Sequence, residues 1–492
     1  MSAVVGVVGA GIMGRGIVQL FAQAGHEVRL FDADADAVVA AVGFVGSMIE
    51  RQMAKGTLSA ADGAAVTARV RPCSALEDLA GCAVVIEAIV ERIDAKQALF
   101  RELEPRVGAD CILASNTSSL LISAIASACE MPERVAGLHF FNPVPLMKIA
   151  EVIPGVLTDP AVTARLVDLV ERAGHRAVTA ADQPGFLINH AGRALYTEGL
   201  RLVEEGVTDF VGVDRIVREA MGFRMGPFEL LDLTGLDVSG AVMQSIYEQF
   251  QHDPRYRPSP LVPPRLGAGL LGRKTGRGFY AYSDGERVEP AEAPAPDAAG
   301  TIWLGDGVGQ EVRALLGDAV VDGPEDPSQP ALLLALWGED VSGAAVRLGL
   351  DPARCVAIDP LTDFARRRTL MYSPATRPEV VAVGHALLAR DGRKVSVIAD
   401  SAGFAAQRIL AMIVNTGCEI AQRGIAAPAD IDDAVRIGLG YPAGPLTLGD
   451  RIGATRILAI LESLQRISGD PRYRPSQWLR RRALLGMPLT AS

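Results

Sequence analysis

Runs of apolar residues alternate with helically spaced apolar positions in the first third of the chain. The aliphatic runs predict strands at residues 3–8, 28–31, 84–86, 111–114 and 135–138. Between the first two runs, residues 17–22 have the apolar spacing of a helix, and residues 34–67 predict two helices separated at Lys55 and Gly56. Strands that alternate with helices predict a parallel sheet with helices on its faces, which is an α/β domain.

Composition narrows the class of protein. The 492 residues are too many for one hydrophobic core, so the chain should divide into about three or four domains. The net charge of −10, with dispersed basic residues, argues against nucleic acid or an anionic membrane as a partner. The sequence contains no uninterrupted apolar run of roughly 18 residues and no charged leader before the first strand, so we expect a cytoplasmic protein.

Cysteine usage agrees with a reducing compartment. The six cysteines have neither the spacing of metal ligands nor the pattern of a disulfide framework. We therefore expect buried, reduced thiols, and we predict neither a metal site nor a disulfide.

Glycines follow the first predicted strand. Residues 9–14 (GAGIMG) have the spacing that permits a tight turn, the approach of a pyrophosphate to the backbone and close packing of the next helix. The second strand ends in Asp32, whose carboxylate would accept hydrogen bonds from an adenosine ribose and repel the extra phosphate of NADP. The plainer alternative is a glycine turn with a surface aspartate. We predict an NAD site formed by Gly9, Gly11, Ile12, Met13, Gly14 and Asp32.

Residues suited to chemistry follow the later strands. Residues 115–119 (SNTSS) and 137–143 (GLHFFNP) lie where two predicted strands end, and Glu151 comes shortly after them. Ligands of a doubly wound sheet bind at the carboxyl ends of its strands, so these residues should gather around one crevice. His139 and Glu151 would then supply acid/base chemistry. A histidine between apolar residues is also compatible with a core position, and Glu87, at another strand end, is assigned no role.

These motifs resemble those of the L-3-hydroxyacyl-CoA dehydrogenases. The matching segments are residues 9–14, 85–91 (VIEAIVE), 115–119, 137–143 and 184–189 (PGFLIN), and the resemblance extends from residue 1 to about 282. It implies that His139 is the general base that takes the hydroxyl proton as hydride leaves for the nicotinamide. Glu151 would orient His139 and stabilise its cationic form.

The same resemblance implies further site residues. Ser118 and Asn189 would complete the catalytic site by hydrogen-bonding the reacting substrate. Ser118 is also compatible with a cap on a helix that begins near Leu120, and Asn189 with a polar side chain inside a helix. The implied ligand contacts are Glu91, Lys96, Asn142 and Lys274 for NAD, and Ser47, Lys55 and Ser118 for the acyl-CoA substrate.

The second half of the chain contains a duplication. The segment at residues 253–259 (DPRYRPS) recurs at residues 470–476, and glycine pairs such as Gly185 and Gly403 keep nearly the same spacing. Helical apolar spacing recurs as well, at residues 188–203 and 409–420. We therefore predict that one helical domain of about 100 residues has been copied.

The region between the copies resembles a shortened first domain that has lost its site. Residues 289–296, rich in proline and alanine, predict a flexible linker, and strands are predicted near residues 301–310 and at 395–399. Gln310 replaces the third glycine of the fingerprint. At the spacing of the duplication, His139 falls on Ala357, Glu151 on Thr369 and Asn189 on Gln407, so the second copy should be non-catalytic.

These observations give a complete division of the chain. We expect an α/β Rossmann-type NAD-binding domain followed by an all-α domain, with a degenerate second copy of both. The expected boundaries are 1–182 for the Rossmann-like domain, 183–284 for the first helical domain, 285–299 for the linker, 300–400 for the degenerate Rossmann-like segment and 401–492 for the second helical copy.

The whole architecture resembles the long members of the family that serve phenylacetate catabolism. Those enzymes oxidise 3-hydroxyadipyl-CoA to 3-oxoadipyl-CoA with NAD, and 3-hydroxybutyryl-CoA is the nearest alternative substrate. A sugar-acid dehydrogenase would keep NAD, His139 and Glu151 without binding CoA, and an NAD-binding structural protein would lack turnover. Single-copy members pair through the helical domain, so we expect the second copy to pack on the first; a homodimer is left open.

Overall fold

The computed structural model describes residues 3–326 and 329–491. These residues form two compact units. One contains the chain up to His190 together with Arg423–Leu439, and the other contains Ala191–Gln422 and the chain from Gly440 onward. A short piece of the second helical copy therefore belongs to the unit that carries the glycine motif.

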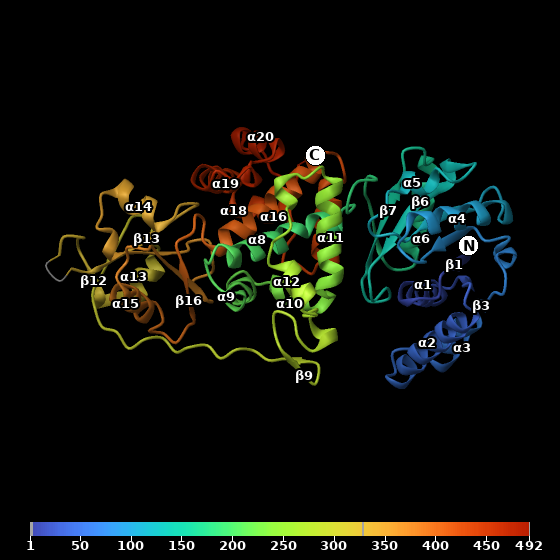
Figure 1. The fold of residues 1–492 in the computed structure, drawn as a ribbon, viewed down its shortest axis with the longest axis horizontal. Helices are drawn as coiled ribbons and strands as arrows, with labels where there is room; N and C mark the ends of the chain where they lie inside the picture. Colours follow the sequence, from blue (N-terminus) through green and yellow to red (C-terminus); the bar gives the residue numbers. More distant parts are fainter. Residues whose placement is uncertain (1–2, 327–328, 492) are drawn as a thin grey trace. The chain divides into compact units, whose positions relative to one another are not determined.

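An eight-stranded sheet organises the first unit, in the order β3-β2-β1-β4-β5-β6-β7-β8. Figure 1 labels β1, β3, β6 and β7 of this sheet. Neighbouring strands are parallel except for β6 and β7, which are antiparallel. This confirms the predicted α/β sheet, and the strand order changes direction beside β1, where such sheets bind ligands. The strands are β1 (Val4–Val8), β2 (Glu27–Phe31), β3 (Val70–Pro72), β4 (Val84–Glu87), β5 (Ile112–Ser115), β6 (Val135–Phe140), β7 (Ile149–Pro154) and β8 (Arg176–Thr179).

Helices cover both faces of this sheet. Apolar side chains of α1, α2 and α6 pack in one core with the sheet, and α4 and α5 contribute buried side chains such as Phe100 and Ile122. The predicted break between two helices after residue 54 is confirmed. The helices are α1 (Ile12–Gln23), α2 (Ala35–Ala54), α3 (Ala60–Ala68), α4 (Ile93–Leu103), α5 (Ile122–Ala126), α6 (Pro160–Arg172), α7 (Ile188–Ala191) and, from the second copy, α17 (Pro428–Asp433).

Helix α2 is long and apolar enough, on length and composition, to cross a membrane. Its buried residues are Val38, Ala41, Val45 and Ile49, which recur every three or four positions and join the core beneath the sheet. One buried stripe of this kind is the pattern of a helix packed on a domain core.

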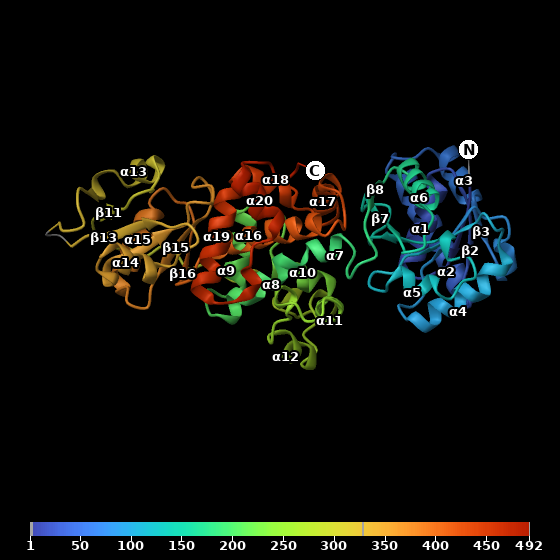
Figure 2. The same cartoon turned by 90° about the horizontal axis from the view of Figure 1, so that it is seen from above.

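The second unit pairs the two helical copies. Helix α8 (Arg193–Glu204) of the first copy packs along α16 (Ala405–Gln422) of the second (Figure 2). The predicted helix at 188–203 is interrupted at Gly192, so α7 and α8 are separate helices. The other helices are α9 (Phe210–Arg215), α10 (Pro227–Thr234), α11 (Leu236–Gln249), α12 (Val262–Gly267), α18 (Pro445–Ile452), α19 (Ala454–Ser468) and α20 (Gln477–Leu485).

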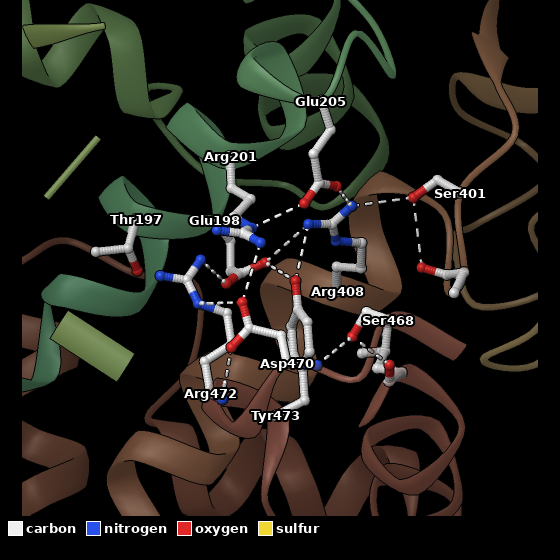
Figure 3. A network of polar contacts seen from close by, with 12 residues as sticks. Thr197, Glu198, Arg201, Glu205, Ser401, Arg408, Ser468, Asp470, Arg472 and Tyr473 are labelled. Carbon is white, nitrogen blue, oxygen red and sulfur yellow. Dashed lines mark hydrogen bonds and ion pairs between the residues drawn. The ribbon is translucent and has the colours of Figure 1, made fainter. Parts of the chain in front are cut away.

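Glu198 lies at the centre of the contact between the two copies. Its carboxylate is fully buried and binds two guanidinium groups of the second copy, Arg472 Nη1 at 3.3 Å and Arg408 Nη2 at 3.4 Å (Figure 3). Tyr473 donates its hydroxyl to Glu198 Oε2 at 3.1 Å. A buried carboxylate shared in this way holds the copies in one register because no water can replace its partners.

The repeated segment at residues 253–259 and 470–476 makes the same kind of contact from each helical copy to the other. Arg255 of the first copy pairs with Glu419 at 3.0 Å, as Arg472 of the second copy pairs with Glu198. Arg255 also donates to the Arg474 carbonyl, and Arg472 to the Pro254 carbonyl. The expected packing of the second copy on the first is therefore present within the chain.

A second sheet lies in the same unit, in the order β12-β11-β13-β14-β15-β16. Its neighbouring strands are parallel except for β14 and β15, so both sheets have their antiparallel pair one strand from the end. This confirms a degenerate copy of the first sheet. Its elements are β11 (Ile302–Leu304), β12 (Val320–Val321), β13 (Ala331–Ala335), β14 (Cys355–Ile358), β15 (Arg368–Tyr372) and β16 (Val395–Ala399), with α13 (Gln310–Leu316), α14 (Val341–Leu348) and α15 (Pro378–Leu388); a hairpin, β9 (Tyr282–Ser283) and β10 (Glu286–Arg287), precedes it.

Cysteine burial differs from the expectation at two positions. Cys82, Cys111, Cys355 and Cys418 are buried, but Cys73 and Cys129 are partly exposed. Both exposed thiols follow the end of a local element, Cys73 after β3 and Cys129 after α5, where fewer neighbours cover the chain.

Candidate active site

The turn after β1 has the backbone that the glycine motif predicts. Gly9 has φ = 109°, and a Cβ there would lie 2.5 Å from the Ala88 carbonyl oxygen. A Cβ on Gly14 would overlap the Gly9 carbonyl oxygen, so only glycine lets α1 approach β1 this closely. Open space surrounds the place of a Gly11 Cβ, beside the first turn of α1. This cradle fits a dinucleotide pyrophosphate, whose charge is favoured at a helix N-terminus.

Asp32 follows β2 at the rim of the same space. Its Oδ2 accepts a hydrogen bond from the Ala10 N–H at 2.7 Å, and its Oδ1 accepts one from the Asp34 N–H at 2.9 Å. A cavity of about 980 Å³ is lined by Gly9, Gly11 and Asp32. The carboxylate is therefore fixed by backbone donors and faces a space large enough for the adenosine half of NAD. Of the other motif residues, Met13 packs on the core and Ile12 is exposed.

His139 and Glu151 face each other across β6 and β7. They are register partners in the antiparallel pair, and His139 Nδ1 lies 2.5 Å from Glu151 Oε2. His139 is 5% exposed and Glu151 is fully buried. Because the carboxylate holds Nδ1, Nε2 is the nitrogen left to exchange a proton with a substrate.

The other oxygen of Glu151 is held by backbone. Glu151 Oε1 accepts hydrogen bonds from the Leu187 N–H at 2.9 Å and the Ile188 N–H at 2.8 Å, at the start of α7. Asn189, the next residue, is half-buried on the same helix. The carboxylate has a fixed position and stays beside the imidazole, where its charge stabilises an imidazolium.

Glu91 organises the serine loop after β5. Its Oε1 accepts hydrogen bonds from the Ser118 N–H at 2.9 Å and the Ser118 hydroxyl at 3.2 Å, and from Thr117 and Ser119. Burial alone would raise the pKa of Glu91, but the Lys96 ammonium and these hydrogen bonds outweigh burial and hold the pKa below its ordinary value. The alternative role of Ser118 as a helix cap is wrong, because α5 begins at Ile122.

Lys96 joins this loop to the end of β4. Its ammonium lies 2.6 Å from Glu87 Oε1 and 3.2 Å from Glu91 Oε2, and the Lys96 and Glu87 side chains are each 1% exposed. Glu87 Oε2 also accepts a hydrogen bond from the Ser115 hydroxyl at 2.6 Å. Glu87, to which the sequence analysis assigned no role, is therefore a structural partner of the site, and it is bound by Ser115, which was expected at the crevice. The only available signal was their position at adjacent strand ends, because the pairing depends on the strand order.

Comparisons with known proteins identify the family of this chain. Residues 4–183 match the family model described as "3-hydroxyacyl-CoA dehydrogenase, NAD binding domain", and residues 185–282 and 403–489 match the C-terminal domain of the same family. The chain belongs to the 3-hydroxyacyl-CoA dehydrogenase family. It is an NAD-dependent oxidoreductase, which sets aside the sugar-acid and non-enzymatic alternatives.

Individual relatives match different lengths of this chain. The chain is 36% identical over 484 residues to 3-hydroxyadipyl-CoA dehydrogenase of Escherichia coli K12, covering 98% of this chain and 97% of that protein. It is 37% identical over 284 residues to 3-hydroxybutyryl-CoA dehydrogenase of Bradyrhizobium diazoefficiens, covering 58% and 97%. A crystal structure of 3-hydroxybutyryl-CoA dehydrogenase from E. coli K12 matches with a TM-score of 0.87 at 34% identity, covering 99% of each chain.

The dehydrogenase has a second, smaller cavity beside α1. This cavity, of about 330 Å³, is lined by Asn142 and Lys55 as well as by Arg15 and Arg51. Asn142 and Lys55 thus lie together at one opening. Ser47 is half-buried on α2, where its hydroxyl donates to the Phe44 carbonyl at 2.8 Å.

Lys274 belongs to the other compact unit of the enzyme. Its ammonium lies 2.6 Å from Asp237 Oδ1, and its side chain is 45% exposed. The structure therefore assigns Lys274 an ion pair within the helical region, and its contact with NAD stays a prediction.

The degenerate sheet corrects one residue of the predicted correspondence. Thr369 stands opposite Asp359, whose N–H donates to the Thr369 carbonyl at 3.2 Å, so Asp359 and not Ala357 takes the place of His139. Nine residues separate Asp359 from Thr369, whereas eleven separate His139 from Glu151, so the register differs by two positions. Gln407 donates to Asp359 Oδ1 at 2.8 Å. Within residues 3–326 and 329–491, Asp359 Oδ2 and the Thr369 hydroxyl have no hydrogen-bond partner.

Proposed function

We propose that this dehydrogenase oxidises 3-hydroxyadipyl-CoA to 3-oxoadipyl-CoA, in the cytoplasm and in phenylacetate catabolism. The observation that carries this proposal is the match to 3-hydroxyadipyl-CoA dehydrogenase over 98% of this chain and 97% of that protein. The two relatives named for 3-hydroxybutyryl-CoA from Bradyrhizobium diazoefficiens and Deinococcus radiodurans match 58% and 56% of this chain. 3-Hydroxybutyryl-CoA is the second candidate, because the full-length structural match carries that name.

The acid/base step is assigned to His139 and Glu151. Bound NAD supplies the hydride acceptor. His139 Nε2 takes the proton of the substrate hydroxyl, since Nδ1 is held by Glu151. Glu151, fixed by two backbone N–H groups, stabilises the imidazolium that forms. Both side chains are buried, so solvent does not compete for the proton.

Further residues are proposed to contact the substrate and the cofactor. Ser118 and Asn189 are assigned hydrogen bonds to the reacting end of the substrate. The NAD contacts of the first unit are assigned to the glycine cradle, Asp32 and Asn142. The contact of Lys274 with NAD is proposed from the family resemblance alone. Glu91 and Lys96 contribute by fixing the loop that carries Ser118, because each is already occupied by protein partners.

The phosphate-bearing part of the acyl-CoA substrate is assigned to the 330 Å³ cavity. Arg15, Arg51 and Lys55 place three cationic groups around it, which suits the phosphates of CoA. The Arg15 guanidinium lies 4.0 Å from the centroid of the Phe44 ring, which holds it in place. Ser47 contributes through its bond to the Phe44 carbonyl.

NADH formation with the two candidate substrates tests the proposal. We expect a higher kcat/KM with 3-hydroxyadipyl-CoA than with 3-hydroxybutyryl-CoA, and loss of both activities in the variant His139→Gln. A higher kcat/KM with 3-hydroxybutyryl-CoA would assign the short substrate instead.

A further inference from the structure

A segment of the second helical copy lies in the compact unit of the catalytic pair. This segment, Arg423–Leu439, contains α17 and a π-helical turn (Ala434–Gly438), and we call it the return segment. It comes from the copy that has Thr369 and Gln407 in place of Glu151 and Asn189. The return segment therefore comes from the copy that lacks the catalytic pair, and it lies in the unit that contains this pair.

The return segment covers the edge of the sheet at β8. The Ala181 N–H donates to the Ile425 carbonyl at 2.8 Å, directly after this strand. Arg176, the first residue of β8, lies 2.5 Å from Asp430 Oδ1 and 3.0 Å from Asp433 Oδ2. Because β8 is an edge strand, these contacts occupy backbone and side chains that would otherwise face solvent.

Gly438 brings the return segment close to the catalytic elements. A Cβ on Gly438 would lie 2.7 Å from Ile188 Cδ1 and 3.5 Å from Ile149 Cγ2. Ile188 begins α7 and Ile149 begins β7, and both side chains are buried. Only glycine leaves room for Ile188 in its present place.

Ile188 connects this contact to the acid/base pair. Its N–H donates to Glu151 Oε1 at 2.8 Å, and Glu151 Oε2 lies 2.5 Å from His139 Nδ1. A continuous series of contacts therefore runs from Gly438 through Ile188 and Glu151 to His139. Interiors packed at this density transmit a displacement of one side chain to its neighbours.

We propose that the return segment is a positioning element for Glu151. Gly438 seats the start of α7, so that the Leu187 and Ile188 N–H groups stay on the carboxylate and the carboxylate stays on His139. The ion pairs of Arg176 with Asp430 and Asp433 hold the segment against β8. The non-catalytic copy thus has a role in catalysis, and this inference rests on the proposed roles of His139 and Glu151.

The variant Gly438→Ala tests the inference in the full-length enzyme, with 3-hydroxyadipyl-CoA and 3-hydroxybutyryl-CoA as probes. We expect kcat to fall about tenfold, since small displacements at a catalytic group are costly, with KM for NAD unchanged.

A second substitution makes the test specific to Ile188. Ile188→Val removes Cδ1, the atom that the new Cβ would meet, so the double variant should recover most of the kcat lost in Gly438→Ala. Gly267→Ala is the matched control, because a Cβ at this helical glycine meets open space. It should keep the wild-type kcat.

Two results would overturn the positioning role. One is a wild-type kcat in both Gly438→Ala and the bulkier Gly438→Val. The other is a loss of kcat that Ile188→Val does not reverse. The variant His139→Gln separates this inference from the proposed function. If His139→Gln keeps wild-type turnover, the proposed acid/base role fails; if it loses turnover while Gly438→Val is normal, only the positioning role fails.

Discussion

His139 Nδ1 and Glu151 Oε2 lie 2.5 Å apart, across a pair of antiparallel strands and twelve positions apart in the chain. The contact arises because the β6–β7 turn returns the chain directly beside itself. Glu151 is in addition held by the N–H groups of Leu187 and Ile188. The pair is therefore fixed before any substrate binds, and each part of it can be tested separately.

Replacement of His139 by Gln should lower kcat by about 10² to 10⁴, the usual scale for the loss of a general base. The dissociation constant of NAD, measured by fluorescence titration, should change little because His139 lies outside the glycine cradle. Glu151→Gln should also lower kcat, with NAD binding again retained. Parallel losses of turnover and NAD affinity would show a folding defect and not a missing base.

Asp32 should determine the choice of cofactor. Asp32→Ala removes an acceptor for the ribose, so we expect NAD to bind about tenfold more weakly and the preference over NADP to shrink. Asp32→Asn is the matched variant, because it keeps an oxygen that can accept from Ala10 while removing the charge. An unchanged ratio of kcat/KM for the two cofactors in both variants would exclude Asp32 from this role.

Lys96→Met should destabilise the NAD-binding region. The substitution keeps the length of the side chain but leaves buried Glu87 without its cation, which costs about 3 to 5 kcal/mol for a pair of this kind. Thermal unfolding followed by circular dichroism measures the effect. Lys148→Met, at an exposed lysine of the same unit, should unfold like the wild type. Equal melting temperatures for the two variants would contradict the argument.

Asp359 should make the stability of the degenerate sheet depend on pH. Burial raises the pKa of this carboxyl to about 6, so the folded chain favours the protonated form. The stability that the neutral Asp359 carboxyl contributes to the folded protein is fully present below its ordinary pKa near 3.8. That stability is lost as the pH rises through 6. Asp359→Asn keeps an acceptor for Gln407 and should stabilise the protein at pH 7.5 by about 3 kcal/mol.

The comparison of wild type and Asp359→Asn at two pH values provides the check. The difference in melting temperature should be large at pH 7.5 and nearly absent at pH 4, where the native carboxyl is already neutral. A difference that does not depend on pH would show that packing, and not charge, separates the two proteins.

Glu198→Gln should weaken the contact between the helical copies. It removes the charge shared by Arg408 and Arg472, two buried guanidinium groups, and we expect a loss of about 3 to 5 kcal/mol in unfolding free energy. Glu205→Gln is the control, since Glu205 also pairs with Arg408 but has a side chain that is 38% exposed. Its effect should be smaller. Similar effects of both variants would argue against a central role for Glu198.

Local pattern was enough to predict the early elements. The strands β1, β2, β4, β5 and β6 and the helices α1 to α3 lie where apolar runs and apolar spacing place them, because each depends on residues close together in the chain. The alternative prediction that Ser118 caps a helix was wrong, because the start of that helix depends on a residue far away in the chain. Helix α5 starts at Ile122, and its first N–H groups are bound by Asp182, a residue sixty positions away.

The degenerate copy shows where a constant offset in residue number between the two copies fails to predict which residues face each other. The duplication correctly indicated that Thr369 and Gln407 replace Glu151 and Asn189 in sequence. It assigned Ala357 to the place of His139, but two fewer residues lie between the register partners of β14 and β15, which puts Asp359 opposite Thr369. Strand register depends on the length of the loop as well as on the alignment, and the spacing does not include that length.

The sequence by itself determined the elements, the duplication and the residues suited to binding and acid/base chemistry, because these are properties of residue type and short-range spacing. Only the tertiary structure decided which of those residues meet. It put Lys96 between Glu87 and Glu91, and it brought Gly438 from the second copy against Ile188. Such contacts depend on strand order and on packing between segments far apart in the chain, and no local pattern of residues specifies them.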